Sequence, residues 1–139
     1  MNVRRTSARV WNVQDLEGGD VFYHHPGPYG AHLLTADGRS VHLSTGTIWT
    51  WHYAVRVTKV TSPSYSLQGP QEILPLLEVA PGRVFCVPNR NMNRVCIMAQ
   101  DFTSPHPNHR LAVELRTGTT LDTAGLTEVR AYAGAEVLW

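Results

Sequence analysis

Two short segments of this chain occur twice, and this repeat limits the possible folds more than any other feature of the sequence. Gly-Asp-Val-Phe at 19–22 returns as Gly-Arg-Val-Phe at 82–85, and Val-His-Leu-Ser-Thr-Gly-Thr at 41–47 returns as Val-Glu-Leu-Arg-Thr-Gly-Thr at 113–119. Matches that keep their order along the chain are the sequence signature of an internal duplication. We therefore predict one small β unit that is present in two copies.

The spacing between the copies changes along the chain, and each change falls in turn-like sequence, where insertions are tolerated. We expect nine extra residues of the second copy in 100–110, because the offset rises there from 63 to 72. The matched positions are Leu34 with Ile97 at an offset of 63, Val41 with Val113 at 72, and segment 55–57 with segment 129–131 at 74.

Apolar and polar residues alternate over short segments, which is the pattern of half-buried strands. Asp37-Gly38 is a strong hairpin signal, because a type I′ turn needs positive φ at both central residues. Helical periodicity is weak, and Pro75 breaks the best helical window, 71–79. The predicted class is therefore all-β, with two tandem SH3-like barrel copies packed about a pseudo-two-fold axis. The expected strands are 8–13, 20–24, 31–36, 40–44, 48–60 as one long or two short strands, 83–87, 94–99, 111–116 and 128–133. The apolar segment 72–79, with Pro75 inside it, is expected at a sheet edge or a bulge, and the apolar segment 136–139 is expected to pack against the body of the protein.

The domain boundaries follow from the repeat. Residues 1–62 form the first copy, residues 71–139 form the second, and the segment 63–70, rich in Ser and Pro, is expected to link them. A copy of about 60–70 residues is near the lower limit for independent stability. We therefore expect the two copies to pack on each other.

The charge balance and the hydropathy disfavour several classes of partner. The chain has 12 basic and 11 acidic residues, and a net charge of +1 disfavours nucleic acid, which usually needs a strongly basic face. No apolar run approaches the roughly 18 residues of a membrane span, and the N-terminal segment lacks the apolar core of a secretory signal. We expect a cytoplasmic protein with no membrane partner.

The two cysteines, Cys86 and Cys96, suit a reducing compartment. If the hairpin that contains them is centred on Asn91, they face each other across it with Cβ atoms about 4.5–5.5 Å apart, which is slightly wide for a disulfide. Two reduced core thiols are the favoured interpretation, and a disulfide is the alternative.

The first copy also resembles a known group of proteins. The pattern Asp-Leu-x-x-Gly-Asp-Val-Phe at 15–22, followed by a hairpin and Val-x-Leu-x-Thr-Gly at 41–46, is similar to small SH3-like barrel proteins of bacteriophages, which are mostly of unknown function. The second copy departs from the pattern at Glu78, Val79 and Arg83. The resemblance implies an accessory protein of a phage or mobile element inside a bacterial host, and it implies no particular activity.

No catalytic signature is present, so we expect neither enzymatic activity nor a cofactor. His24, His32 and His42 are expected on adjacent strands, where three imidazoles form a metal site. No carboxylate or cysteine is spaced to complete this site, and the second copy has Val95 and Glu114 in place of His32 and His42. Solvent-facing histidines are the favoured interpretation, and a metal-dependent enzyme is the weakest alternative.

The segment Trp-Thr-Trp-His-Tyr at 49–53 carries three aromatic side chains, Trp49, Trp51 and Tyr53, that point to one face of a strand. They form either a core wall, the favoured interpretation, or a platform on which a base or another flat ligand stacks. The corresponding stretch 120–127 has no aromatic residue, so the repeat does not need the platform. The cations expected to bind a phosphate beside it are Arg39, Arg56 and Arg110.

Two functions from different classes fit these features. The first is a non-enzymatic accessory protein that holds a small anionic ligand, such as a nucleotide, in a cleft between copies or protomers and so sequesters an immune signal of the host. The second is an interaction or assembly module that contacts a host protein or forms a homo-oligomer through the loops 26–30 and 100–110.

Overall fold

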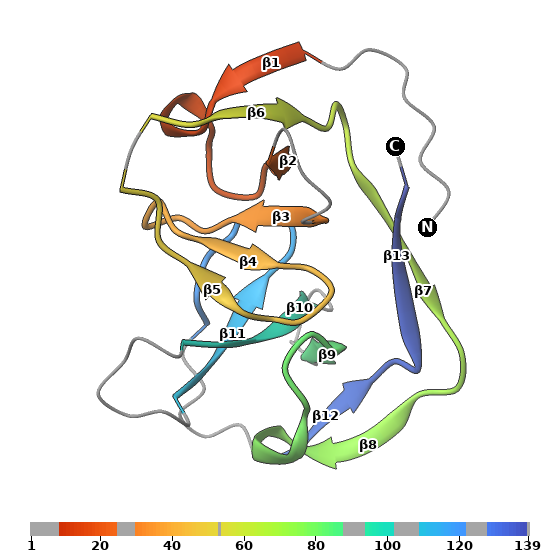
Figure 1. Ribbon diagram of the computed structural model, residues 1–139. Coiled ribbons are helices and arrows are strands. Elements are labelled where there is room, and N and C mark those ends of the chain that lie inside the picture. The colour runs from red at the N-terminus through yellow and green to blue at the C-terminus, as the bar shows by residue number, and fades with distance from the viewer. Residues whose placement is uncertain are drawn as a thin grey trace.

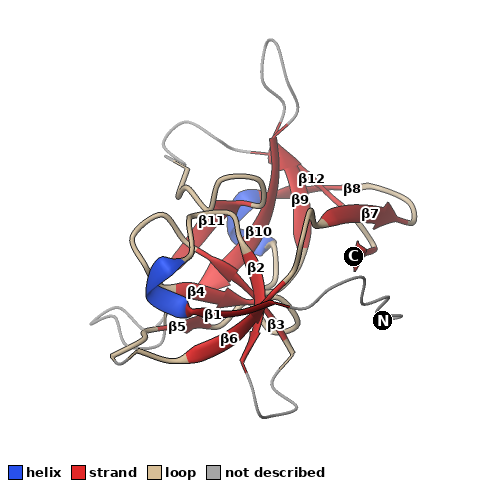
Figure 2. Ribbon diagram, turned by 90° about the horizontal axis from the view of Figure 1, so that it is seen from above, coloured by secondary structure: helices blue, strands red, loops and turns tan. Residues whose placement is uncertain are grey.

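The computed structural model describes residues 9–24, 30–52, 54–87, 94–101, 109–121 and 128–138. Strands dominate these ranges, and Figure 2 shows helical turns only as two short segments, the 3-10 helices η1 (Val13–Asp15) and η2 (Leu76–Glu78). The predicted all-β class is therefore confirmed. Within the same ranges, no helix has the length and apolar character that crossing a bilayer demands.

Six short strands of the first half form sheet A, in the antiparallel order β1-β6-β2-β3-β4-β5. The hairpin at Asp37-Gly38 is confirmed, but its type I′ turn is not, because Gly38 has a φ of 86° and Asp37 does not have a positive φ. The predicted segment 48–60 contains two short strands. The strands are β1 (Arg9–Asn12), β2 (Val21–His24), β3 (Ala31–Leu34), β4 (Ser40–His42), β5 (Ile48–Trp49) and β6 (Arg56–Lys59).

Five strands of the second half form sheet B, in the antiparallel order β11-β10-β9-β12-β8. Pro75 ends the edge strand β8, a position where a missing N–H group is tolerated. Neither sheet closes into a barrel within the described strands, so the predicted SH3-like barrel units are not confirmed. The strands are β8 (Glu72–Pro75), β9 (Val84–Val87), β10 (Arg94–Gln100), β11 (Arg110–Glu114) and β12 (Glu128–Ala131).

The segment 63–70, the predicted linker, contains strand β7 (Ser64–Gln68). This strand pairs antiparallel with β13 (Gly134–Leu138) over five residue pairs. Figure 1 shows that β7 leads from sheet A toward sheet B and that β13 leads back along it. We call this two-stranded sheet the strap, and its two strands follow β6 and β12, the equivalent strands of the two halves.

The strand pairs of sheet A recur in sheet B. The alignment of β10 with β3, however, is shifted by one residue from the alignment that the sequence predicts. Phe22 pairs with His32, and its counterpart Phe85 pairs with Cys96. The offset is 63 between the phenylalanines (85 − 22) and 64 between their partners (96 − 32). His32 therefore corresponds to Cys96 and not to Val95, and a one-residue shift moves every side chain of a strand to the opposite face.

Two further predicted matches change for the same reason. Leu34 corresponds to Met98 rather than to Ile97, because the offset of 64 holds along the whole strand pair (98 − 34). Val57 corresponds to Val129 at an offset of 72 (129 − 57) instead of the predicted 74, because the two occupy the same register against the edge strands β1 and β8.

The register also separates the two cysteines. Val95 pairs with Cys86, whereas Cys96 pairs with Phe85. Successive side chains of a strand point to opposite faces, so the predicted opposition of the cysteines is wrong. Both are buried free thiols, and burial raises the pKa of Cys96 to about 12.

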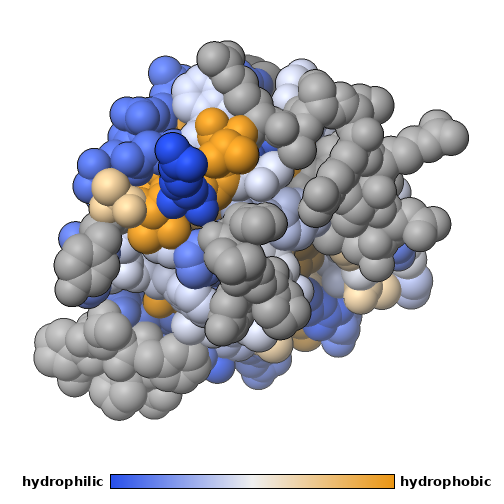
Figure 3. Space-filling model, turned by 45° about the horizontal axis from the view of Figure 1, so that its top comes forward, coloured by the Kyte–Doolittle hydropathy of each residue, from blue (hydrophilic) through white to orange (hydrophobic). Residues whose placement is uncertain are grey.

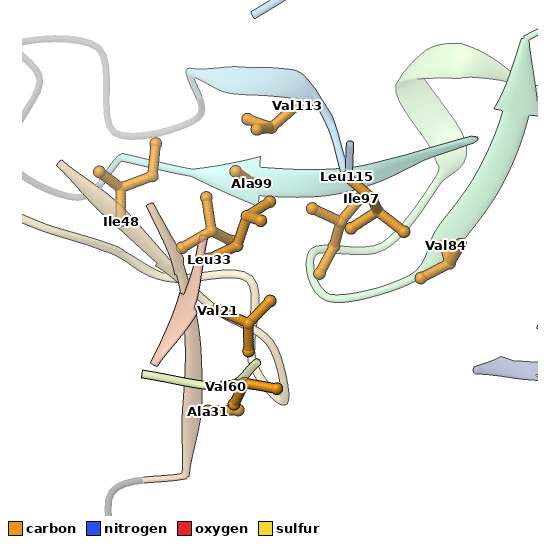
Figure 4. Packing of buried hydrophobic residues seen from close by; sticks show 11 residues of the cluster. Val21, Ala31, Leu33, Ile48, Val60, Val84, Ile97, Ala99, Val113 and Leu115 are labelled. Atoms are coloured by element: carbon orange, nitrogen blue, oxygen red, sulfur yellow. The ribbon is translucent and has the colours of Figure 1, made fainter. Parts of the chain in front are cut away.

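Each half has its own outer core, and a third core joins the halves. Figure 4 shows the joining core, in which side chains such as Leu33 of sheet A and Ile97 of sheet B point toward one another. The two halves therefore pack on each other, as the sequence predicts. Equivalent residues fill the outer cores, namely Val13, Leu16, Phe22, Leu34 and Val57 in the first half and Leu76, Val79, Phe85, Met98 and Val129 in the second.

The repeated Thr-Gly-Thr turns lie where the backbones of the two halves meet, and we call this contact region the seam. Gly46 has a φ of 74° and Gly118 a φ of 70°, and a Cβ atom on either glycine would lie 2.2 Å from a backbone atom of the other half. Backbone hydrogen bonds cross the seam at the same places, from Gln100 to Gly46 at 2.8 Å and from Ala36 to Gly118 at 3.0 Å. The glycines of the repeat thus permit close contact between the halves as well as tight turns.

Candidate functional site

Five aromatic rings of the first half lie in contact on sheet A. Their neighbouring centroids are 4.8–6.1 Å apart. Strand pairing brings them together, because β3 pairs with β4 and β4 pairs with β5. We call this group the His–Trp cluster, and its members are His24, His32, His42, Trp49 and Trp51.

His32 lies at the centre of the cluster and is 0% exposed. Its ring stacks on Phe22 at 5.4 Å and meets Trp49 edge-on at 4.8 Å. The prediction of a solvent-facing side chain is wrong for this residue, because all four residues of β3 are buried. Burial, and then the nearby His42 and His24, lower the pKa of His32 from 6.5 to about 3, so the ring is neutral at neutral pH.

The buried side chain of Ser40 fixes the tautomer of His32. Ser40 Oγ lies 2.9 Å from Trp51 Nε1 and 3.1 Å from His32 Nδ1. The indole N–H can only donate, so Ser40 accepts from Trp51, and its own hydroxyl proton has His32 Nδ1 as its acceptor among the described residues. We therefore assign the ring proton of His32 to Nε2, a buried atom without a hydrogen-bond partner in the described ranges.

At three positions of the cluster, and at that of Ser40, the second half has apolar residues, whereas His42 corresponds to Glu114. Val41 of β4 pairs with Ile48 of β5, and Val113 of β11 pairs in the same way with Thr120. Both members of the second pair lie 72 residues after their counterparts, so the next residue, Trp49, corresponds to Leu121 (121 − 49). The backbone therefore tolerates a plain apolar core at these positions, and the fold does not require the polar cluster. His24, His32, Ser40 and Trp49 correspond to Val87, Cys96, Ala112 and Leu121, which all belong to or pack against the outer core of the second half.

The structure brings together two of the three predicted aromatic residues. The ring centroids of Trp49 and Trp51 are 5.9 Å apart, and both side chains are half-buried. β5 ends at Trp49, so Trp51 belongs to the segment after the strand and packs edge-on against Phe22. The pair is thus part of a core wall and partly accessible to solvent, and Tyr53 lies outside the described residues.

Two of the three predicted arginines already hold partners. The Nε atom of Arg39 lies 2.9 Å from Asp37 Oδ2, and its Nη1 atom lies 2.8 Å from Asp101 Oδ2. Arg110 Nη1 donates to two carbonyl oxygens of η2 and its C-cap, at 2.8 and 3.0 Å. A ligand phosphate would therefore have to compete with these protein groups for either guanidinium.

Arg56, the third predicted arginine, is exposed on β6 and lines a shallow groove of about 320 Å³ beside Trp11. Lys59 Nζ lies 4.8 Å from the centre of the Trp11 ring. Figure 3, which brings the β1 and β6 end of the molecule forward, shows a small hydrophobic patch crossed by strongly hydrophilic residues. This face mixes cations with apolar surface.

The three-histidine metal site, the weakest alternative from the sequence, is not assembled among the described side chains. Across the described ranges, no group of three or more His, Cys, Asp or Glu side chains is placed to hold a metal ion. His32 and His42 come close, with centroids 5.0 Å apart, but they meet edge to face.

Two grooves lie along the seam between the halves, at equivalent positions. The first has a volume of about 540 Å³ and contains Arg83, and the second has a volume of about 730 Å³ and contains Asp20, the counterpart of Arg83. Tyr65 of the strap and Leu115 line both grooves. The sequence predicts a cleft between the copies but none of its lining residues. The sequence signal that could have located the cleft is the residue after each repeated glycine, Asp20 after Gly19 and Arg83 after Gly82.

Comparison with known proteins does not assign the chain to a family. No protein-family model, no curated protein and no solved structure matches the chain.

Proposed function

We propose that the protein is a non-enzymatic binding protein that holds a small planar anionic ligand, such as a nucleotide, against Trp49 and Trp51. The observation that carries this proposal is the His–Trp cluster, because the second half fills the positions of His24, His32 and Trp49 with an apolar core. Aromatic side chains stack on the flat face of any base, with about 1–3 kcal/mol per base.

The polar groups of the cluster suit the edge of a heterocyclic ring. His32 Nε2 is a neutral donor without a described partner, and it complements a ring nitrogen or a carbonyl oxygen of the ligand. The half-buried rings of His42 and Trp49 cover His32, so the ligand reaches this donor when one of them moves.

The negative charge of the ligand is expected at Arg39. This residue precedes Ser40, which pairs directly with Trp49 across β4 and β5. The partner Asp37 has a side chain that is 54% exposed, and exposed ion pairs contribute at most about 1 kcal/mol. A phosphate group can therefore replace Asp37 on Arg39 at little cost.

The motif resemblance of segments 15–22 and 41–46 to phage proteins supports a biological setting for this proposal. In that setting the protein is an accessory of a phage or mobile element that acts in the bacterial cytoplasm. It removes a nucleotide signal of host immunity by binding it.

Thermal unfolding in the presence of a nucleotide panel tests the proposal. A ligand at about 100 times its Kd stabilises the folded protein by about 2.7 kcal/mol. We expect at least one mono-, di- or cyclic nucleotide to raise the Tm of the wild type and of Leu121→Ala, but not of Trp49→Ala. Leu121 is the matched control, because it occupies the position of Trp49 in the second half. A panel without any stabilising member would remove the proposal.

A second candidate function, an assembly module, is favoured by two exposed apolar side chains. Ile73 on the edge strand β8 is 65% exposed, and Leu77 in η2 is 81% exposed. Edge strands and apolar patches are common contact sites. Size-exclusion chromatography with light scattering should then show self-association that Leu77→Glu abolishes and Gln14→Glu, at the equivalent position of the first half, does not. A monomeric wild type would count against this candidate.

A further inference from the structure

The first groove of the seam has the size and the lining of a small-molecule site. Its volume of about 540 Å³ lies within the range of about 300–1,000 Å³ that ligand pockets occupy. Both halves contribute to its apolar floor, with Ala31 from sheet A and Val84 and Ile97 from sheet B. Three aromatic side chains, Tyr23, Tyr65 and Tyr132, also line the groove.

Tyr65, which lines both grooves, carries a phenolic hydrogen-bond donor. Its hydroxyl oxygen is buried and forms no hydrogen bond in the described ranges. Burial raises the pKa of Tyr65 to about 12, so the hydroxyl keeps its proton at neutral pH. Buried polar groups almost always have a partner, and a ligand oxygen in the groove would give this hydroxyl one that the described residues do not provide.

The first groove is lined by two charged side chains, Arg83 and Glu136, and the charge of Arg83 is neutralised within the protein. Arg83 Nη2 lies 2.9 Å from Glu72 Oε2, and its Nε donates to the carbonyl oxygen of Tyr132 at 3.1 Å. More charged side chains line the second groove, namely Asp20, Arg94, Glu114 and Arg116, although Asp20 pairs with Lys59 and Arg94 pairs with Glu114. The first groove therefore favours a molecule with an apolar body over a highly charged one.

We infer that the first groove is a binding site, separate from the His–Trp cluster, for an amphipathic small molecule. The apolar body of this molecule covers the floor formed by Ala31, Val84 and Ile97, and one of its oxygen atoms accepts a hydrogen bond from Tyr65. Such a ligand removes the apolar floor from water and gives the hydroxyl an acceptor.

Fluorescence titration with anilinonaphthalene sulfonate tests this inference, because the probe combines apolar rings with sulfonate oxygens. We expect saturable binding at one site per chain, and we expect Tyr65→Phe to raise the Kd about 5- to 10-fold through the loss of one hydrogen bond. Ala135→Trp, which places a large side chain at the groove, should abolish binding. Ala80→Trp is the matched control, because Ala80 is exposed and does not line the groove.

Three outcomes would overturn the inference. The first is an unchanged Kd in Tyr65→Phe, and the second is a lower Tm of Tyr65→Phe without probe, since that loss would reveal a partner within the protein. The third is loss of probe binding in Trp49→Ala, which would place the probe at the His–Trp cluster. An unchanged Kd in Trp49→Ala supports a separate site, whatever the nucleotide panel shows.

Discussion

The two halves of the molecule share one scaffold and differ in what fills its outer core. Cys96, Ala112 and Leu121 make a plain apolar core in sheet B, whereas the first half buries an imidazole and a hydroxyl at the same positions. His32 Nε2 has no partner among the residues that the structure describes, and leaving a buried donor unpaired costs about 1–3 kcal/mol. The first half carries a destabilising arrangement that the second half shows to be unnecessary for folding, and this difference indicates a role other than stability.

The largest expected difference between the halves appears in acid. The pKa of His32 is lowered from 6.5 to about 3 in the folded protein, so the unfolded chain binds a proton first as the pH falls. The stability that the neutral imidazole contributes is fully present above about pH 6.5 and is lost toward pH 3, by about 5 kcal/mol in total. Urea unfolding over this pH range should show the loss in the wild type but not in His32→Cys, which carries the residue of the second half. Equal slopes would contradict a buried neutral imidazole.

Substitutions of the two glycines at the seam should lower the free energy of unfolding by similar amounts in both halves. Gly118→Ala and Gly46→Ala each place a Cβ atom 2.2 Å from backbone of the other half at positive φ, so we expect each to lose about 3 kcal/mol or more. Gly38→Ala is the control, because Gly38 has a φ of 86° but no atom within 4 Å of an added Cβ, and it should lose only about 1 kcal/mol. Urea unfolding measures the loss in each of the three variants. A similar loss in all three would contradict the close backbone contacts at Gly46 and Gly118.

The polar network of the first half should behave as a unit. Ser40→Ala removes the shared partner of Trp51 and His32 and is expected to lower the free energy of unfolding by about 2 kcal/mol. Combining Ser40→Ala with His32→Cys reproduces the cysteine and alanine of sheet B, so the double variant should lose less than the sum of the single substitutions. A double-mutant cycle by chemical unfolding measures this coupling, and strict additivity would argue against the network.

The smallest expected difference concerns two ion pairs. Arg39 and Asp101 join the halves at 2.8 Å with side chains 29% and 12% exposed, whereas Arg94 and Glu114 are 3.7 Å apart within sheet B. Asp101→Asn should lose about 1 kcal/mol, and Glu114→Gln at most about 0.5 kcal/mol. Chemical unfolding at low and high salt would distinguish the contributions of the two pairs, because salt screens the more exposed pair, Arg94 and Glu114, more strongly. The opposite order would show that the inter-half pair does not matter.

The fold class was predictable from local signals, but the register was not. Gly38 and Pro75 mark a hairpin and an edge strand by their backbone chemistry alone. The extra residue between β9 and β10 leaves no such signal, because Leu33 and Leu34 match Ile97 equally well. That single residue decides which face each side chain of β10 occupies.

The candidate site was predictable only in part. The spacing of Trp49 and Trp51 marks them as neighbours, and their ring contact confirms it. The burial of His32 could not be predicted, because alternation along a strand shows a polar residue but not whether both faces of the sheet are covered. Sheet A is covered at β3 by the joining core on one side and by the cluster on the other.

The strap has a consequence for how the molecule is held together. Gly69 and Pro70, which follow β7, are exposed, so a protease could cut the chain there. The two fragments would remain associated, because the ladder between β7 and β13 and the joining core do not depend on that peptide bond. A nicked molecule should therefore keep its shape, and the unit of folding is the whole pair of halves rather than either one.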